Sequence, residues 1–184
     1  MTYIDDIVTF IATAEPTVSD QSPPHGWGAV SAAVDAAAQH SPHADTSLAY
    51  AVGCAVAEQV AAVLDSAESA DGWSRRSVAG AIGAGAAVGR LLEFDDAKLR
   101  HLLGLCATQA TGLRSLDDTE TGALQVAKAA ADAVEAALLV SNGFTSSADG
   151  LTGRRGLFAL MAAGAGPPST FGGGTGSKVA HHGE

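Results

Sequence analysis

The segment Ser77–Leu92 constrains the fold most, because it combines the apolar spacing of a helix with several glycines. Each glycine in a helix interior costs about 0.5–1 kcal/mol relative to alanine, so a glycine-rich helix needs a compensating gain. Close approach of neighbouring helices supplies one, since glycine and alanine leave no bulky side chain between two helix axes. We therefore expect this helix to lie at the centre of a helical bundle, together with a leucine-faced helix over Lys98–Leu113.

The composition indicates an all-α fold. Alanine, the best helix former, supplies about a fifth of the chain. Aromatic residues make up only 5 % of the chain, and a shortage of aromatic and β-branched residues disfavours sheets. A chain of 184 residues is long enough to bury roughly 70 % of its unfolded surface. These features predict a compact Ala/Gly-rich helical bundle of six to seven helices.

Apolar spacing, capping residues and glycine or proline stops define the expected helices. These are Thr2–Ala14, Ala29–Gln39, a helix from Ser41 as N-cap to Leu64, Ser77–Leu92, Lys98–Leu113 with Asp95 or Asp96 as cap, Ala123–Ser141 and Leu157–Ala163. Residues 1–163 are expected to form a single helical domain. Residues 164–184 are rich in glycine, proline and serine and are expected to be a disordered tail.

The charge balance limits the classes of partner. Twenty acidic residues against ten basic ones give a net charge of −10, which disfavours nucleic acid. We expect no membrane association, because the longest small apolar run is shorter than the roughly 20 residues that span a bilayer. Two cysteines, Cys54 and Cys106, in apolar helical patterns indicate buried free thiols. With no signal peptide evident, a cytoplasmic location is expected.

We expect neither a cofactor nor a metal site. The acidic turn with Asp117, Asp118 and Glu120 has no suitably spaced histidines, so we interpret it as a solvated loop.

Several short motifs follow one another between about Pro24 and Met161. They are Gly72–Trp73 before the glycine-alanine helix, Leu91–Asp95 leading into Leu99–Gly104, Cys106–Leu113, Gly143–Thr145, and the spaced set Leu151, Gly153, Arg154, Gly156 and Phe158. This order resembles the helical domain of the MmgE/PrpD family, which includes 2-methylcitrate dehydratase, cis-aconitate decarboxylase and iminodisuccinate epimerase. The resemblance implies an all-α fold and a homodimer, because the family's helical domain commonly forms the dimer interface.

The resemblance also implies a chemistry. Members of the family abstract a proton next to a carboxylate, then lose water or CO₂ or take up a proton again. They need a base, an acid and cations that hold carboxylates. The family takes these groups from an Asp-Asp-Thr-His stretch, a His-Pro turn, a Gly-Trp/Phe-His-Pro turn and a Lys-x-Leu-His segment. Further groups come from a second, α+β domain that closes over the site as a lid.

This sequence departs from most of those motifs. The His-Pro turn becomes His25-Gly26-Trp27, which retains one histidine. The Gly-Trp-His-Pro turn becomes Gly72-Trp73-Ser74-Arg75, and the Lys-x-Leu-His segment becomes Gly122-Ala123-Leu124-Gln125. The Asp-Asp-Thr-His stretch has no clear counterpart, and we expect the fold to lack the α+β lid domain. We interpret Ser74 as the N-cap region of the next helix.

Two hypotheses remain open from the sequence. The first is a non-catalytic binding or partner subunit, associating as a homodimer or with a full-length MmgE/PrpD relative. The second is a repurposed minimal lyase or isomerase acting on a small organic acid or biosynthetic intermediate, with His25 as acid/base. In that case Arg75 and Lys128 hold an anionic group of the ligand. Arg75 is a candidate because a cation at a helix start opposes the helix dipole, which suggests pairing with an anion or an acidic residue.

Overall fold

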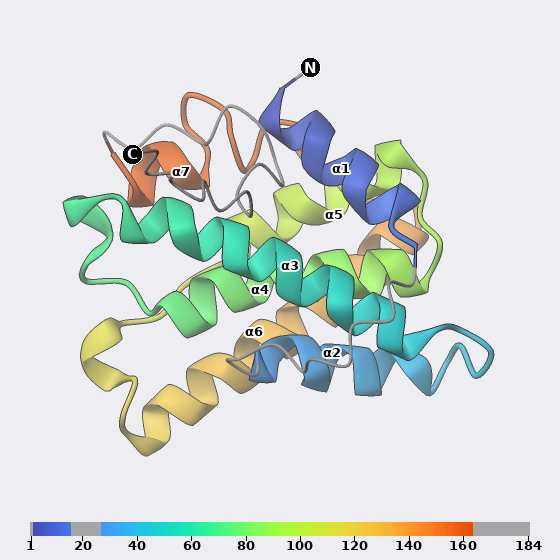
Figure 1. The fold of residues 1–184 in the computed structure, drawn as a ribbon, viewed down its shortest axis with the longest axis horizontal. Coiled ribbons are helices and arrows are strands. Elements are labelled where there is room, and N and C mark those ends of the chain that lie inside the picture. Colours follow the sequence, from blue (N-terminus) through green and yellow to red (C-terminus); the bar gives the residue numbers. More distant parts are fainter. Residues whose placement is uncertain (1, 16–26, 164–184) are drawn as a thin grey trace, which may run out of the picture.

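Seven α-helices and two short 3₁₀ helices make up the regular structure of residues 2–15 and 27–163, the part of the chain that the computed structural model describes (Figure 1). The α-helices are α1 (Tyr3–Thr13), α2 (Gly28–Ala38), α3 (Thr46–Asp65), α4 (Arg75–Leu91), α5 (Asp96–Gln109), α6 (Glu120–Ser141) and α7 (Leu157–Met161), and the 3₁₀ helices are η1 (Glu68–Ala70) and η2 (Arg114–Leu116). The only β-type pairing in these residues is one isolated bridge between Trp73 and Leu113. The predicted all-α fold is therefore confirmed.

Helix α4 forms the centre of the bundle, as its composition predicts. Every residue from Ser77 to Gly89 is buried, and α4 packs against α1, α2, α3, α5 and α6. Figure 1 shows α3 lying along one side of α4, with α2 and α6 below. Helix α5, the second helix expected at the centre, instead lies on one flank of α4 and buries only one face, around Leu99 and Leu102.

The glycines of α4 mark the places where neighbouring helices come close. A β-carbon on Gly83 would lie 2.5 Å from the carbonyl oxygen of Gly53 in α3, and one on Gly53 would lie 2.7 Å from the carbonyl oxygen of Gly83. A β-carbon on Gly85 would lie 2.5 Å from the sulfur of Cys106 in α5. No real β-carbon tolerates such distances, so close packing accounts for these glycines.

Side-chain caps set several helix ends where the sequence predicts them. Ser74 is the N-cap of α4, and Asp95 caps α5 by accepting a 2.9 Å hydrogen bond from the backbone N–H of Lys98. Helix α6 ends at Ser141, and Gly143 then adopts a φ of +84°, a conformation that favours glycine.

Three other boundaries differ from the prediction. Helix α3 begins at Thr46 and not near Ser41, because Asp45 accepts the capping hydrogen bond from Leu48 N–H at 2.9 Å. Helix α6 begins at Glu120, three residues before the expected start, with Thr119 as its cap.

Helix α5 ends at Gln109, short of Leu113. The following residue, Ala110, is extended, and Gly112 has a φ of +131°. Leu113 therefore leaves the helix direction and pairs with Trp73.

Two parts of the sequence analysis lie outside the described residues: His25 and the tail 164–184. Among the described helices, α3 is long and apolar enough to cross a membrane by composition, but 56 % of its most apolar window is buried inside the bundle. Burial of this kind is typical of a core helix in a folded domain.

Candidate functional site

Two turns that are distant in the sequence meet at the start of α4. The backbone N–H of Ser74 donates to the carbonyl oxygen of Gly112 at 2.9 Å. The backbone N–H of Arg114 donates to the carbonyl oxygen of Gly72 at 3.0 Å. These bonds flank the bridge between Trp73 and Leu113. They place the Gly-Trp turn next to the segment that leads into α6.

Ser74 is fully buried at this junction. Its hydroxyl donates to Oδ1 of Asp117 at 2.5 Å and accepts from the backbone N–H of Ser77 at 3.3 Å. The interpretation of Ser74 as an N-cap is confirmed. The interpretation of the Asp117 turn as merely solvated is wrong for Asp117, whose side chain is only 18 % exposed and holds this hydrogen bond.

The side chain of Gln125, in the segment Gly122–Gln125 that departs from the family's Lys-x-Leu-His motif, is also engaged in hydrogen bonds. Its side-chain Oε1 accepts from the backbone N–H of Leu113 at 2.6 Å, and its Nε2 donates to the carbonyl oxygen of Leu113 at 3.3 Å. The amide therefore ties α6 to the turn that precedes it. Both hydrogen-bonding ends of the side chain are used within the chain.

Lys128 is paired on its own helix. Its Nζ lies 2.7 Å from Oδ1 of Asp132, a buried carboxylate that is 9 % exposed. Both residues line a small pocket of about 150 Å³, together with Ser77 and Gln125. The sequence analysis did not single out Asp132, although its position four residues after Lys128 is the spacing of a helical ion pair.

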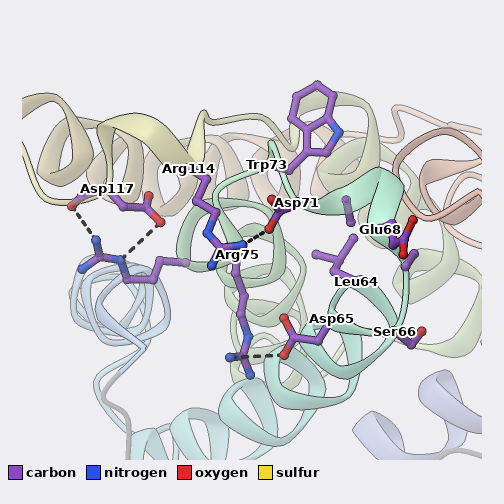
Figure 2. Close-up of a pocket in the computed structure, with 12 residues that line it drawn as sticks. Leu64, Asp65, Ser66, Glu68, Asp71, Trp73, Arg75, Arg114 and Asp117 are labelled. Carbon is purple, nitrogen blue, oxygen red and sulfur yellow. Dashed lines mark hydrogen bonds and ion pairs between the residues drawn. The ribbon is translucent and has the colours of Figure 1, made fainter.

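Arg75 lines a larger open groove of about 740 Å³, shown in Figure 2. The groove is formed by the end of α3, the turn through η1, the start of α4 and the turn before α6; its lining residues are Leu64, Asp65, Ser66, Ala67, Glu68, Ala70, Asp71, Trp73, Arg75, Arg76, Arg114 and Asp117. A guanidinium nitrogen of Arg75 lies 3.3 Å from Oδ2 of Asp65. Arg75, the cation at the start of α4, therefore pairs with an acidic residue at the end of α3.

The other two arginines of the groove are paired as well. Arg114 forms an ion pair with Asp71 (Figure 2). Arg76 contacts Asp117 and lies 3.5 Å from Oδ1 of Asp118. Sequence reasoning missed Arg114 and Asp65, because only the fold brings them beside the start of α4.

The groove carries both signs of charge. Its lining holds three arginines against four carboxylates, namely Asp65, Glu68, Asp71 and Asp117. The Arg75–Asp65 pair is about half exposed, with side chains 49 % and 53 % accessible. Exposed pairs of this kind contribute only about 0–1 kcal/mol, so the Arg75–Asp65 pair adds little to the stability of the fold. No group of three or more side chains suited to a metal ion occurs among the described residues.

The structure does not describe His25, but it describes the residues that follow it. Trp27 is buried, and a β-carbon on Gly28 would lie 3.3 Å from Cγ1 of Val126, next to Gln125 in α6. The start of α2 therefore lies against the first turns of α6.

Comparison with known proteins identifies the family of this helical domain. No functionally curated protein matches the chain significantly. The sequence profile of the MmgE/PrpD N-terminal domain, however, matches residues 19–170, a span that contains every helix from α2 to α7. Because this match covers well over half of the sequence and the fold is all-α, the chain belongs to the MmgE/PrpD family through that N-terminal domain.

Proposed function

We propose that this chain is a non-catalytic MmgE/PrpD-type helical protein that acts as a binding or partner subunit. One observation carries the proposal: Ser74 and Gln125, which replace histidines of the family's motifs, are both committed to hydrogen bonds inside the bundle. Their side chains hold the fold together at the junction of α4 and α6.

The replaced groups matter because of their protonation chemistry. A general acid or base contributes about 10²–10⁴-fold to a rate when its pKa lies near the working pH. A serine hydroxyl and a glutamine amide do not titrate in that range. Residues that act as a unit are not additive, but the loss of even one such group is large enough to suppress the family's reaction.

Turnover assays test the proposal directly. The purified chain is incubated with 2-methylcitrate and with cis-aconitate, and products are followed by mass spectrometry beside a full-length MmgE/PrpD enzyme as positive control. We expect no product above the uncatalysed background. Product formation that depends on this chain contradicts the proposal.

A second candidate function is a minimal lyase or isomerase that uses His25 for proton transfer. It is favoured by the position of the start of α2 against α6, near the pocket that holds Lys128. If turnover of some small organic acid is found, this candidate requires that His25→Ala abolishes it. Ser74→Ala, assayed where the variant remains folded, should leave it largely intact.

The binding role has two kinds of partner in this proposal. One is a protein, either a second copy of this chain or a full-length relative. The other is a small anionic ligand held by Arg75, with Lys128 as the second candidate cation. Titration with dicarboxylates, followed by NMR, tests the ligand, and Arg75→Ala should weaken any binding seen. The proposal includes a cytoplasmic location, supported by two buried free cysteines.

A further inference from the structure

Two adjacent arginines, Arg154 and Arg155, are exposed and have no partner within the described part of the chain. Every other lysine or arginine of residues 2–15 and 27–163 forms an ion pair with a carboxylate, donates to a backbone carbonyl or lies over an aromatic ring. Within those residues, Asp149 is the nearest carboxylate along the sequence, and it forms no ion pair with either arginine. In a chain with a net charge of −10, two cations without a carboxylate are unexpected.

The loop that carries these arginines is tightly closed. The backbone N–H of Gly153 donates to the carbonyl oxygen of Asp149 at 2.7 Å, and the backbone N–H of Leu157 donates to the carbonyl oxygen of Gly150 at 2.9 Å. A β-carbon on Gly156 would lie 2.8 Å from that same carbonyl oxygen, so only glycine fits there. The backbone at both arginines is therefore held in place, and a partner does not have to order the loop before it binds.

An exposed leucine lies on the helix that follows the loop. Helix α7 is at the outside of the bundle beside α3 (Figure 1), and three of its five residues are buried. The other two are Ala159 and Leu160. At 73 % exposure, Leu160 is the most exposed large hydrophobic side chain of the described residues. We call the surface formed by Arg154, Arg155, Ala159 and Leu160 the α7 face.

The chemistry of the α7 face fits an acidic segment of another polypeptide. A guanidinium group binds a carboxylate through two parallel N–H···O bonds, and Leu160 offers an apolar residue of the same segment a place to pack. A small anion fits less well, because a single exposed ion pair in water is weak unless other contacts hold the two groups together. Nucleic acid and anionic membranes are disfavoured, because the net charge of −10 repels a surface with many negative charges.

We propose that the α7 face is a docking site for an acidic, leucine-containing segment of a different protein, with Arg154 and Arg155 binding its carboxylates. This inference rests on the partner role proposed above, and it gives that partner a chemistry and a place on this chain. Arg75 and Lys128, the cations assigned to a small anionic ligand, are not part of the α7 face.

Fluorescence anisotropy with a labelled peptide of sequence Gly-Glu-Glu-Leu-Glu-Glu-Leu-Gly tests the docking site. Two comparison peptides carry glutamine in place of every glutamate, or alanine in place of every leucine. We expect saturable binding of the first peptide and affinity at least about fivefold lower for each of the other two. Binding should also weaken between about 20 mM and about 500 mM salt, because exposed charges are screened.

Single substitutions locate the site. Arg154→Ala, Arg155→Ala and Leu160→Ala should each weaken binding of the acidic peptide by about fivefold. The matched control is Lys98→Ala, which removes one exposed positive charge on α5, outside the α7 face. It changes the net charge as much as either arginine variant does, and it should bind the peptide as the wild type does. Circular dichroism checks that every variant is folded.

Chemical-shift mapping by NMR on the isotope-labelled chain should place the effects of the peptide at residues 150–160. The inference is overturned if no saturable binding is seen, or if Lys98→Ala weakens binding as much as Arg154→Ala does. It is also overturned if the shifts centre on the groove around Arg75, a result that would leave the small-ligand role proposed above intact.

Binding to phosphatidylglycerol vesicles through Arg154 and Arg155, without binding of the peptide, would assign the face to a membrane and overturn the inference as well. The peptide experiments measure binding alone, so their failure leaves the expected absence of turnover untouched. Conversely, turnover of 2-methylcitrate or cis-aconitate would contradict the proposed function without changing the affinity for the peptide.

Discussion

The hydroxyl of Ser74 donates a 2.5 Å hydrogen bond to Oδ1 of Asp117, which joins the first turn of α4 to the turn before α6. The hydroxyl oxygen of Ser74 also accepts a hydrogen bond from the backbone N–H of Ser77, so one buried side chain both caps a helix and links two segments. At the position where the family's motif has a histidine, this chain has a structural hydrogen bond.

Replacement of this serine should destabilise the fold. Ser74→Ala removes an N-cap, which costs about 0.5–2 kcal/mol, and leaves Asp117 without its serine donor. We expect a loss of about 1–2 kcal/mol in the free energy of unfolding by urea denaturation. Ser47→Ala, in the exposed first turn of α3, is the control and should change stability little. An unchanged midpoint for Ser74→Ala would show that the bond contributes nothing net.

The crossing of α3 and α4 predicts a steric effect. Gly83→Ala places a β-carbon 2.5 Å from the carbonyl oxygen of Gly53, so the two helices must move apart. Overpacking of this kind costs about 1–3 kcal/mol, measured as a lower thermal midpoint. Gly72→Ala is the matched control, because a β-carbon there has no neighbour within 4 Å; it should be neutral or stabilising. Equal effects of the two substitutions would contradict the packing argument.

Acid should weaken the attachment of α1. The backbone N–H of Thr2, followed by the Arg100 guanidinium, lowers the pKa of Asp5 to about 2. Because this pKa lies below the unfolded value of about 3.9, the carboxylate stabilises the folded state above pH 4. That contribution is lost as the pH falls from about 4 to 2.

The measurement is the difference in thermal midpoint between wild type and Asp5→Asn as a function of pH. It should be present at neutral pH and should shrink towards zero near pH 2. Asp6→Asn, which removes the neighbouring charge, serves as control. A difference that does not depend on pH would rule out this linkage.

The two cysteines should resist modification in the folded protein. Burial, with a smaller contribution from nearby Asp132, raises the pKa of Cys106 to about 12, and burial also raises that of Cys54. At pH 8 a thiol with a pKa of about 12 is thiolate in roughly one molecule in ten thousand. We expect no reaction with a thiol-specific reagent until denaturant is added, when both cysteines react. Rapid labelling of the native protein would mean that the bundle opens readily.

Local rules predicted most helices of this fold but not all of their ends. The start of α5 follows from the adjacent cap candidates Asp95 and Asp96, of which Asp95 accepts the capping hydrogen bond from Lys98. The start of α3 was misjudged because Ser41 and Asp45 both satisfy the preference for a short polar cap, and it is Asp45 that accepts the capping hydrogen bond from Leu48. The end of α5 was missed because the apolar spacing continues to Leu113, although Gly112 turns the chain towards Trp73.

The candidate site was less accessible to sequence reasoning. The ion pair between Lys128 and Asp132 follows from their four-residue spacing on a helix and could have been predicted from the sequence. The bonds of Ser74 with Asp117 and of Gln125 with Leu113 depend on how the turns before α4 and α6 meet. No periodicity or motif in the sequence predicts that these two turns pack together.

The burial of α4 also limits which parts of the fold can move. Because five other helices pack against it, α4 cannot shift or rotate without disturbing all of those interfaces, and packed cores do not deform gradually. Any conformational change is therefore expected at its periphery, in the turn through η1, in the turn before α6 or in the solvent-facing side of α6. Helix α4 is therefore expected to stay in place when any of these outer segments moves.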